Sequence, residues 1–168
     1  MNKLSFKIGL LFFVFIVMIE AFLFVILYQN LAEERVDEIM NNLLARGNTH
    51  RDVLEDHYDS STLEHVGIME SQSQFKVVII DEDGEILVTS NPLEADMAEV
   101  IEHVKTEHIP LEGEIVDADW HTGTYIATDS PIEVEGTYKG HVIMFAETDY
   151  VSKPLRELSK QFIIAGIV

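Results

Sequence analysis

The 168-residue chain contains no cysteine. Disulfide bridges, thiolate metal sites and cysteine nucleophiles are therefore excluded, and stability must come from the burial of apolar side chains. This absence is compatible with an exported domain that avoids oxidisable thiols, although it does not by itself determine the compartment.

Basic residues are scarce as well. The sequence has 11 Lys and Arg against 30 Asp and Glu, which gives a formal net charge of -19. A surface of this sign repels phosphates, so nucleic acid is excluded as a partner. Two interpretations of the acidic residues remain: they keep the chain soluble, or part of them forms a face that attracts cations.

Catalytic motifs are also missing. The sequence has no nucleophile motif, no glycine-rich loop that would cradle a phosphate, and no kinase signature. We therefore expect no catalytic residue and no cofactor in this segment. A divalent cation acting as a signal is the small partner that the negative charge suggests.

The sequence does contain one long apolar run. Residues 8–27 are apolar apart from Glu20, and a helix of about 20 such residues crosses the hydrocarbon core of a membrane. A cleaved signal peptide is the alternative, but its apolar region usually spans only about 7–15 residues and ends at small side chains. Because bulky side chains continue here to Tyr28, we predict a retained transmembrane helix over residues 8–28.

The charges around this run predict its direction. Lys3 and Lys7 precede it, whereas Glu33 and Glu34 follow it. By the positive-inside rule, residues 1–7 are cytoplasmic and the chain from residue 29 lies outside the cell membrane. A charged Glu20 has an unfavourable free energy in lipid. It therefore either contacts a second span or a dimer mate, or is protonated and has no functional role.

A second apolar run, residues 162–168, is too short to span a membrane. Leu155, Leu158 and Phe162 lead into it at helical spacing, which favours a helix entering the membrane. We expect residues 161–168 to be the start of a truncated second transmembrane helix. A short tail packed on the domain is the alternative.

Residues 29–160 are predicted to form one extracytoplasmic domain. An apolar stripe from Val36 to Leu44 recurs at helical spacing, so a long amphipathic helix continues the membrane helix. Such a stripe packs either on its own domain or along a dimer seam. Residues 59–74 are polar and are predicted to form a short helix and a loop.

The remaining pattern predicts a mixed α+β fold with a central antiparallel sheet of about five strands. Residues 75–80 and 86–88 form a hairpin around an Asp-Gly turn. A helix is expected to begin at a capping Asn91, with Pro92 at its first position. Strands are expected over residues 114–120, 125–134 and 141–146, and a last helix from about Ser152.

Three segments carry a family resemblance: FKVVIIDEDGEILVTSNP, TYIATDSPIEVEGTYKGHVIMFAET and DYVSKPLRELSKQF. In this order they resemble the PAS-like, Cache-type extracytoplasmic domains of bacterial two-component sensor histidine kinases. The resemblance implies a homodimer that drives a cytoplasmic kinase beyond residue 168 and, through it, a response regulator. Chemoreceptors and diguanylate cyclase receptors share these motifs, and a non-signalling membrane-anchored structural module is the remaining alternative.

The chain departs from the amino-acid-binding members of that family. Their pocket motif resembles Arg-x-Trp-Tyr, but no Arg occurs here between Arg51 and Arg156, and Trp120 is followed by His121. A carboxylate ligand held by a bidentate Arg is therefore disfavoured.

Two sets of residues are candidates for binding. Polar and aromatic side chains around one predicted hairpin suit the lining of a PAS-like pocket, although Trp120 and Tyr125 are also suited to a core. This ligand-binding set comprises Asp119, Trp120, His121, Tyr125 and Asp129. Oxygen ligands for a metal are offered only weakly, by Asp81, Asp83 and Asp117, which are equally suited to capping turns.

The predicted direction of the anchor has a direct test. A reporter enzyme fused after Ser90 should be active only when it is chosen to work outside the cytoplasm, because Lys3 and Lys7 hold the N-terminus inside. Activity of a cytoplasm-specific reporter at the same position would reverse the topology.

Overall fold

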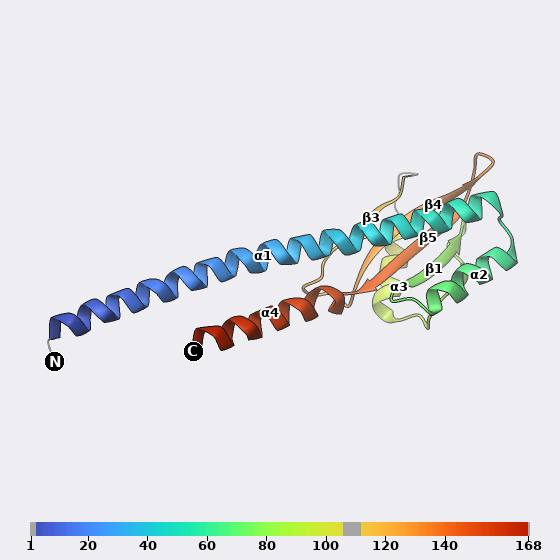
Figure 1. Ribbon diagram of the computed structural model, residues 1–168. Coiled ribbons are helices and arrows are strands. Elements are labelled where there is room, and N and C mark those ends of the chain that lie inside the picture. Colours follow the sequence, from blue (N-terminus) through green and yellow to red (C-terminus); the bar gives the residue numbers. More distant parts are fainter. Residues whose placement is uncertain (1–2, 106–111, 168) are drawn as a thin grey trace. The chain divides into compact units, whose positions relative to one another are not determined.

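The computed structural model describes residues 3–105 and 112–167 (Figure 1). The outermost residues of the predicted terminal segments, 1–2 and 168, therefore lie outside the described residues. The chain divides into two compact units: one comprises Val36–Ser152, and the other combines residues up to Arg35 with residues from Lys153.

Helix α1 (Lys3–Asp56) joins the predicted membrane helix and the predicted amphipathic helix into one helix of 54 residues. It is the one helix in the described part of the chain that is long and apolar enough to cross a membrane, by length and composition. In the unit that contains its N-terminal half, the rings of Phe24 and Phe162 lie 4.7 Å apart. Phe162 belongs to α4 (Asp149–Ile167), so the two apolar segments pack on each other within that unit.

The other unit contains the predicted antiparallel sheet. Its strands are β1 (Lys76–Asp81), β2 (Ile86–Thr89), β3 (Glu114–Asp117), β4 (Tyr125–Val134) and β5 (Thr137–Glu147). They pair antiparallel in the order β2-β1-β5-β4-β3. The α+β, PAS-like fold class with five strands is thereby confirmed.

Local chemistry explains the β1–β2 hairpin and the close approach of β5 to β1. The Asp81 carboxylate accepts hydrogen bonds from the backbone N–H groups of Asp83 and Glu85, at 3.0 and 2.8 Å, and Gly84 has a φ of +80°. Gly140 has a φ of +138°, and a Cβ there would lie 1.9 Å from the carbonyl oxygen of Ile80. Only glycine therefore allows β5 to approach β1 at this point.

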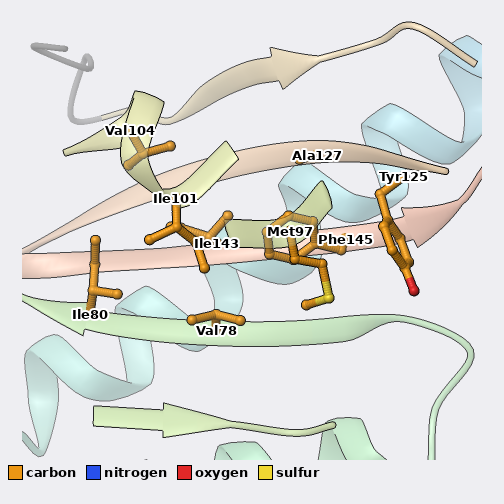
Figure 2. Packing of buried hydrophobic residues seen from close by; sticks show 9 residues of the cluster. All are labelled: Val78, Ile80, Met97, Ile101, Val104, Tyr125, Ala127, Ile143 and Phe145. Carbon is orange, nitrogen blue, oxygen red and sulfur yellow. The ribbon is translucent and has the colours of Figure 1, made fainter. Parts of the chain in front are cut away.

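Helices cover both faces of the sheet. On one face, Gly47 of α1 lies so close to β4 and β5 that a Cβ would be 2.9 Å from Ser130 Oγ and 3.2 Å from Met144 Cγ. On the other face, α3 (Ala95–Val104) buries Met97, Ile101 and Val104 against the strands, as Figure 2 shows. The sheet is thus the middle layer of three.

The start of α3 corrects the sequence prediction. The helix begins at Ala95 with Glu94 in the capping position, not at Asn91. The Asn91 side-chain oxygen instead accepts a hydrogen bond from Ser90 Oγ at 2.8 Å. The backbone carbonyl of Asn91 accepts one from Thr89 Oγ1 at 2.5 Å. An Asn that is suited to capping is equally suited to a turn, and here the strand end uses it.

The bounds of β3 and β5 differ from the prediction by several residues. β3 ends at Asp117, because Asp117 Oδ1 accepts the N–H of Asp119 at 2.8 Å and turns the chain away from the ladder. Strand β5 begins at Thr137 and reaches Glu147, so it is longer at both ends than the apolar run that predicted it. Pairing with β4 extends it into the polar residues of the turn.

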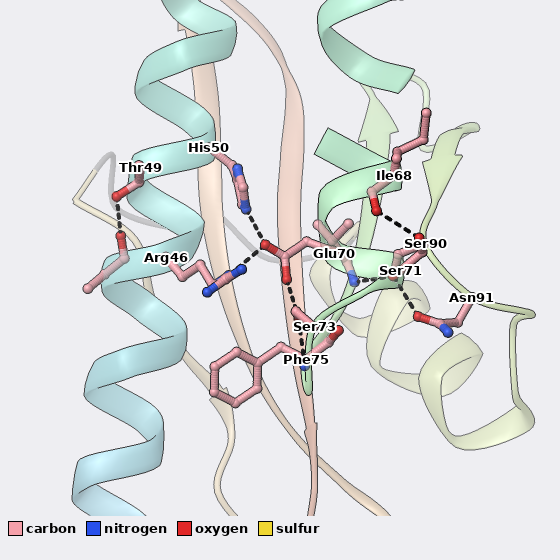
Figure 3. Close-up of polar contacts among 12 residues, drawn as sticks. Arg46, Thr49, His50, Ile68, Glu70, Ser71, Ser73, Phe75, Ser90 and Asn91 are labelled. Atoms are coloured by element: carbon pink, nitrogen blue, oxygen red, sulfur yellow. Dashed lines mark hydrogen bonds and ion pairs between the residues drawn. The ribbon is translucent and has the colours of Figure 1, made fainter. Parts of the chain in front are cut away.

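A buried carboxylate joins α1 to the short helix α2 (Ser60–Ser71) (Figure 3). The Glu70 side chain is fully buried and accepts hydrogen bonds from Arg46 Nε, His50 Nε2 and Ser73 Oγ at 2.6, 2.6 and 2.7 Å. Burial alone would raise the pKa of Glu70, but the bonds from His50, Ser73 and Arg46 outweigh it and lower the pKa to about 2.

This network predicts a pH dependence of folding. The folded-state pKa of Glu70 is about 2, below its ordinary 4.5, so its ionised contacts stabilise the fold above about pH 4.5 and are lost as the pH falls toward 2. Replacing Glu70 by Gln should lower the free energy of unfolding at neutral pH by about 1–3 kcal/mol. It should also flatten the pH dependence of that free energy below pH 4.5.

Urea denaturation in detergent micelles, followed by the fluorescence of the single tryptophan Trp120, measures both effects. Glu64→Gln is the matched control, because Glu64 lies exposed on the same helix. A Glu70→Gln variant whose stability falls with acid as steeply as that of the unsubstituted chain would contradict the role of the carboxylate.

Candidate functional site

A cavity of about 680 Å³ lies between α3 and the β3–β4 connection. Helix α3 contributes three carboxylates to it, and β3 contributes a fourth. The acidic residues in its lining are Asp96, Glu99, Glu102 and Asp117. His103 lies beside them, Val100, Val116 and Tyr125 supply apolar surface, and residues 122–124 complete the wall.

The spacing of residues in α3 explains why acids gather there. Asp96, Glu99 and Glu102 recur every three residues, so they share one side of the helix. The apolar stripe that begins at Met97 is buried on the sheet, and this turns the acidic side toward β3. Lys105 pairs with Glu102 at 2.8 Å, but the described lining itself contains no Lys or Arg, so the cavity keeps a net negative charge.

Tyr125 connects the cavity to a charged network. Its ring contacts the Phe145 ring edge-on, with centroids 6.1 Å apart, and its hydroxyl donates to Glu94 Oε1 at 2.6 Å. Lys76 Nζ hydrogen-bonds to the same hydroxyl and lies 2.8 Å from Glu94 and 3.6 Å from Glu147. One lysine of β1 thereby joins the start of α3 to the first residue of β4 and the last residue of β5.

The pKa values of this network reflect these bonds. The bond from Lys76 lowers the pKa of the exposed Glu94 carboxyl. Burial and the bond to Glu94 raise the pKa of the Tyr125 hydroxyl above its ordinary range. Burial alone would lower the pKa of Lys76, but its bonds to Glu94 and Tyr125 raise it instead. The lysine is therefore cationic at every physiological pH.

The wall of the cavity is also bonded to the start of α4. Thr148 donates its backbone N–H to the carbonyl of Thr124 at 2.9 Å and its hydroxyl to the carbonyl of Gly123 at 3.0 Å. The Thr148 carbonyl in turn accepts the N–H groups of Val151 and Ser152, both at 3.0 Å, in the first turn of α4. Thr148 therefore joins the cavity wall to the first turn of α4 by hydrogen bonds.

Of the five residues predicted to bind a ligand, Tyr125 lines the cavity. Asp119, Trp120 and His121 lie in the β3–β4 connection that borders it, where the Trp120 and His121 rings stack at 3.8 Å. Asp119 accepts hydrogen bonds from the Thr122 hydroxyl and from the N–H groups of His121 and Thr122, and these bonds lower its pKa. Its carboxylate shapes the connection.

The fifth predicted residue lies elsewhere. Asp129 is fully buried on β4, and its Oδ2 is 2.7 Å from Nδ1 of the buried His141 on β5. Burial raises the pKa of Asp129, although the contact with His141 opposes this shift. Strand periodicity puts Tyr125 and Asp129 on one face of the sheet, but three residues of β4 lie between them.

The weak metal candidates are also separated in space. Asp81 and Asp83 belong to the β1–β2 turn, where Asp81 accepts backbone N–H groups, and Asp117 belongs to the cavity. Within residues 3–105 and 112–167, no group of three or more His, Asp or Glu side chains is arranged to hold a metal ion. A cation in the cavity would have to draw the carboxylates together.

Sequence reasoning missed the acids of α3. Asp96, Glu99 and Glu102 form a periodic acidic face beside an apolar stripe, and this pattern was visible in the sequence. Because such a face is usually solvated, only its position opposite β3 distinguishes it as part of a cavity.

Sequence comparisons do not assign the chain to a family. No protein-family model matches it, and no curated protein matches it significantly.

The chain is similar to several solved structures. The chain is similar to an extracellular ligand binding receptor from Desulfohalobium retbaense, with 17% identity, a TM-score of 0.48, and coverage of 75% of this chain and 26% of that one. It is similar to a domain of a sensory box/GGDEF family protein from Vibrio parahaemolyticus, with 14% identity, a TM-score of 0.45, and coverage of 83% and 62%.

A third similar structure is the extracellular domain of a protein described as a histidine kinase. Its identity is 15% and its TM-score is 0.37, with coverage of 76% of this chain and 62% of that one. The chain thus spans between a quarter and about three fifths of the length of these three structures.

The bond between the cavity wall and α4 can be tested by substitution. Thr148→Val keeps the branched shape but removes the hydroxyl donor, so the carbonyl of Gly123 loses its partner. One such bond contributes about 1 kcal/mol. Amide hydrogen exchange at residues 122–125 and 149–152 should therefore become about fivefold faster.

Thr148→Ser, which retains the hydroxyl, is the control and should exchange at nearly the original rate. Unchanged exchange in the valine variant would show that the hydroxyl does not join these two segments.

Proposed function

We propose that the chain is the membrane-anchored, extracytoplasmic sensor region of a bacterial signalling receptor, with residues 29–160 outside the cell membrane. The receptor is a homodimeric sensor histidine kinase whose kinase lies beyond residue 168 and acts on a cytoplasmic response regulator. The observation that carries this proposal is the direct bonding of the cavity wall to the start of α4 through Thr148.

A sensor requires two conformations that its stimulus stabilises unequally. The cavity offers a place where such a stimulus could act, because α3 forms one wall and the β3–β4 connection forms the other. A ligand that draws α3 toward the connection would strain two links at once. One is the bond of Thr148 to residues 123–124, and the other is the contact of Lys76 with Glu94 and Glu147.

Both links end at the same place in the chain. Glu147 is the last residue of β5, Thr148 follows it, and α4 begins at Asp149. The first turn of α4 and the apolar C-terminal segment belong to one continuous helix. A movement of the first turn would therefore be passed along this helix. This is the step by which an external stimulus would reach the cytoplasmic kinase.

The charge of the cavity favours a cationic stimulus. Four carboxylates line the cavity and only Glu102 among them pairs with a described lysine, Lys105, so the remaining negative charge would repel a carboxylate ligand. Divalent cations or cationic peptides are therefore the proposed ligands. Because no three acidic or imidazole side chains are preassembled among the described residues, the affinity should be weak, on the order of 10⁻⁴–10⁻³ M, as in other extracellular modules.

Calorimetry on the whole chain in lipid nanodiscs, at fixed ionic strength, tests this proposal. Magnesium or calcium should give a saturable signal, whereas amino acids and dicarboxylic acids should give none. Glu99→Gln should weaken cation binding by at least about threefold, because it removes one carboxylate of the cavity.

Glu135→Gln is the matched control. It changes the net charge equally, but Glu135 lies exposed in the β4–β5 turn, outside the cavity. Equal losses of cation affinity in both variants would mean that cations are attracted only by the net charge of the domain. Saturable binding of a carboxylate, with none of cations, would refute the proposed ligand class.

A further inference from the structure

Glu20 presents a physical problem inside the apolar segment of α1. Twelve residues without charge precede it from Ile8, and seven follow it to Leu27. Its side chain is exposed, and it has no hydrogen-bond or ion-pair partner among the side chains that the structure describes. In hydrocarbon such a group costs several kcal/mol unless it is neutral and hydrogen-bonded.

The side chain cannot solve this problem by reaching water. Glu20 lies nine residues before Gln29, which corresponds to about 13 Å along a helix. A glutamate side chain extends only a few ångströms, unlike the longer Lys and Arg side chains that reach the interface. Lipid tails offer no donor or acceptor, so the partner must be protein.

The surroundings of Glu20 form a groove of about 320 Å³ between α1 and α4, within one compact unit. Phe24 and Phe162 pack against each other and hold the two helices together there. Ser159 also lines the groove, and its hydroxyl donates to the Leu155 carbonyl at 2.9 Å, so its oxygen can still accept. The groove is thus apolar except for one carboxyl and one hydroxyl.

We propose that this groove is a contact surface between two copies of the chain, held by hydrogen bonds of the Glu20 carboxyl. This inference rests on the proposed membrane anchor. A neutral carboxyl is both a donor and an acceptor, so it pairs with its own kind or with a serine hydroxyl.

A second copy is the occupant that these features favour. Each copy in a bilayer carries the same unsatisfied carboxyl on the same surface, and a twofold axis would satisfy both at once. Ala21, which lines the groove next to Glu20, leaves room for a close approach of another helix.

The absence of cysteine allows a clean test. Ala21→Cys introduces the only thiol into the groove, and Leu23→Cys introduces one on the same helix outside the groove lining. In lipid vesicles, oxidation should cross-link copies through position 21 far more than through position 23.

The role of the carboxyl is tested in the Ala21→Cys background. Glu20→Leu should reduce cross-linking about three- to tenfold, the range expected for interhelical hydrogen bonds in membranes. Glu20→Gln, which keeps a donor and an acceptor, should retain it. Phe22→Leu, an exposed position outside the groove lining, is the control and should have no effect.

Equal cross-linking at positions 21 and 23, or cross-linking that Glu20→Leu leaves unchanged, would overturn this inference and make Glu20 a passive neutral group. Alkaline extraction of the same vesicles reports the anchor separately. Release of the chain by alkali would overturn the membrane anchor together with the contact, whereas retention without specific cross-linking would overturn the contact alone.

Discussion

Strand β5 pairs with β1 along one side and with β4 along the other, and its residues from Gly140 to Ala146 are all buried. The rest of the domain depends on this insertion, because without β5 the β1–β2 hairpin and the β3–β4 pair would be separate two-stranded pieces, which are marginally stable in water. Gly140 permits the closest approach, where a Cβ would collide with the carbonyl of Ile80. The central strand ends at Glu147, and α4 begins two residues later at Asp149. The central strand of the sheet is therefore the one that connects to α4.

This arrangement separates the polar groups of the domain by role. Glu70 and its three donors join α1 to α2 on one face of the sheet, where a buried charge is stabilised by complete hydrogen bonding. On the other face, Asp129 and His141 form a buried pair. The acids of α3 line an open cavity, where Glu102 is paired with Lys105 at 2.8 Å.

Much of the fold could be predicted from the sequence because its signals are local. The turn at Gly84 and the apolar run over residues 75–80 predicted the first hairpin, and strand β4 was predicted with the bounds that the structure shows. Asn91 misled the prediction because the same side chain suits a helix cap and a turn. The candidate site was predicted less well: the β3–β4 connection was located, but the opposite wall formed by Asp96, Glu99 and Glu102 was not.

The sequence by itself determined the apolar segment of α1, the negative charge and the alternation of strands, because each depends on neighbouring residues or on composition. Only the tertiary structure decided that α3 faces the β3–β4 connection, that Asp129 is buried with His141 rather than lining the cavity, and that Thr148 bonds the cavity wall to α4. These contacts join residues between 12 and about 25 positions apart. Their positions follow from the order in which strands pair, which no local pattern of side chains encodes.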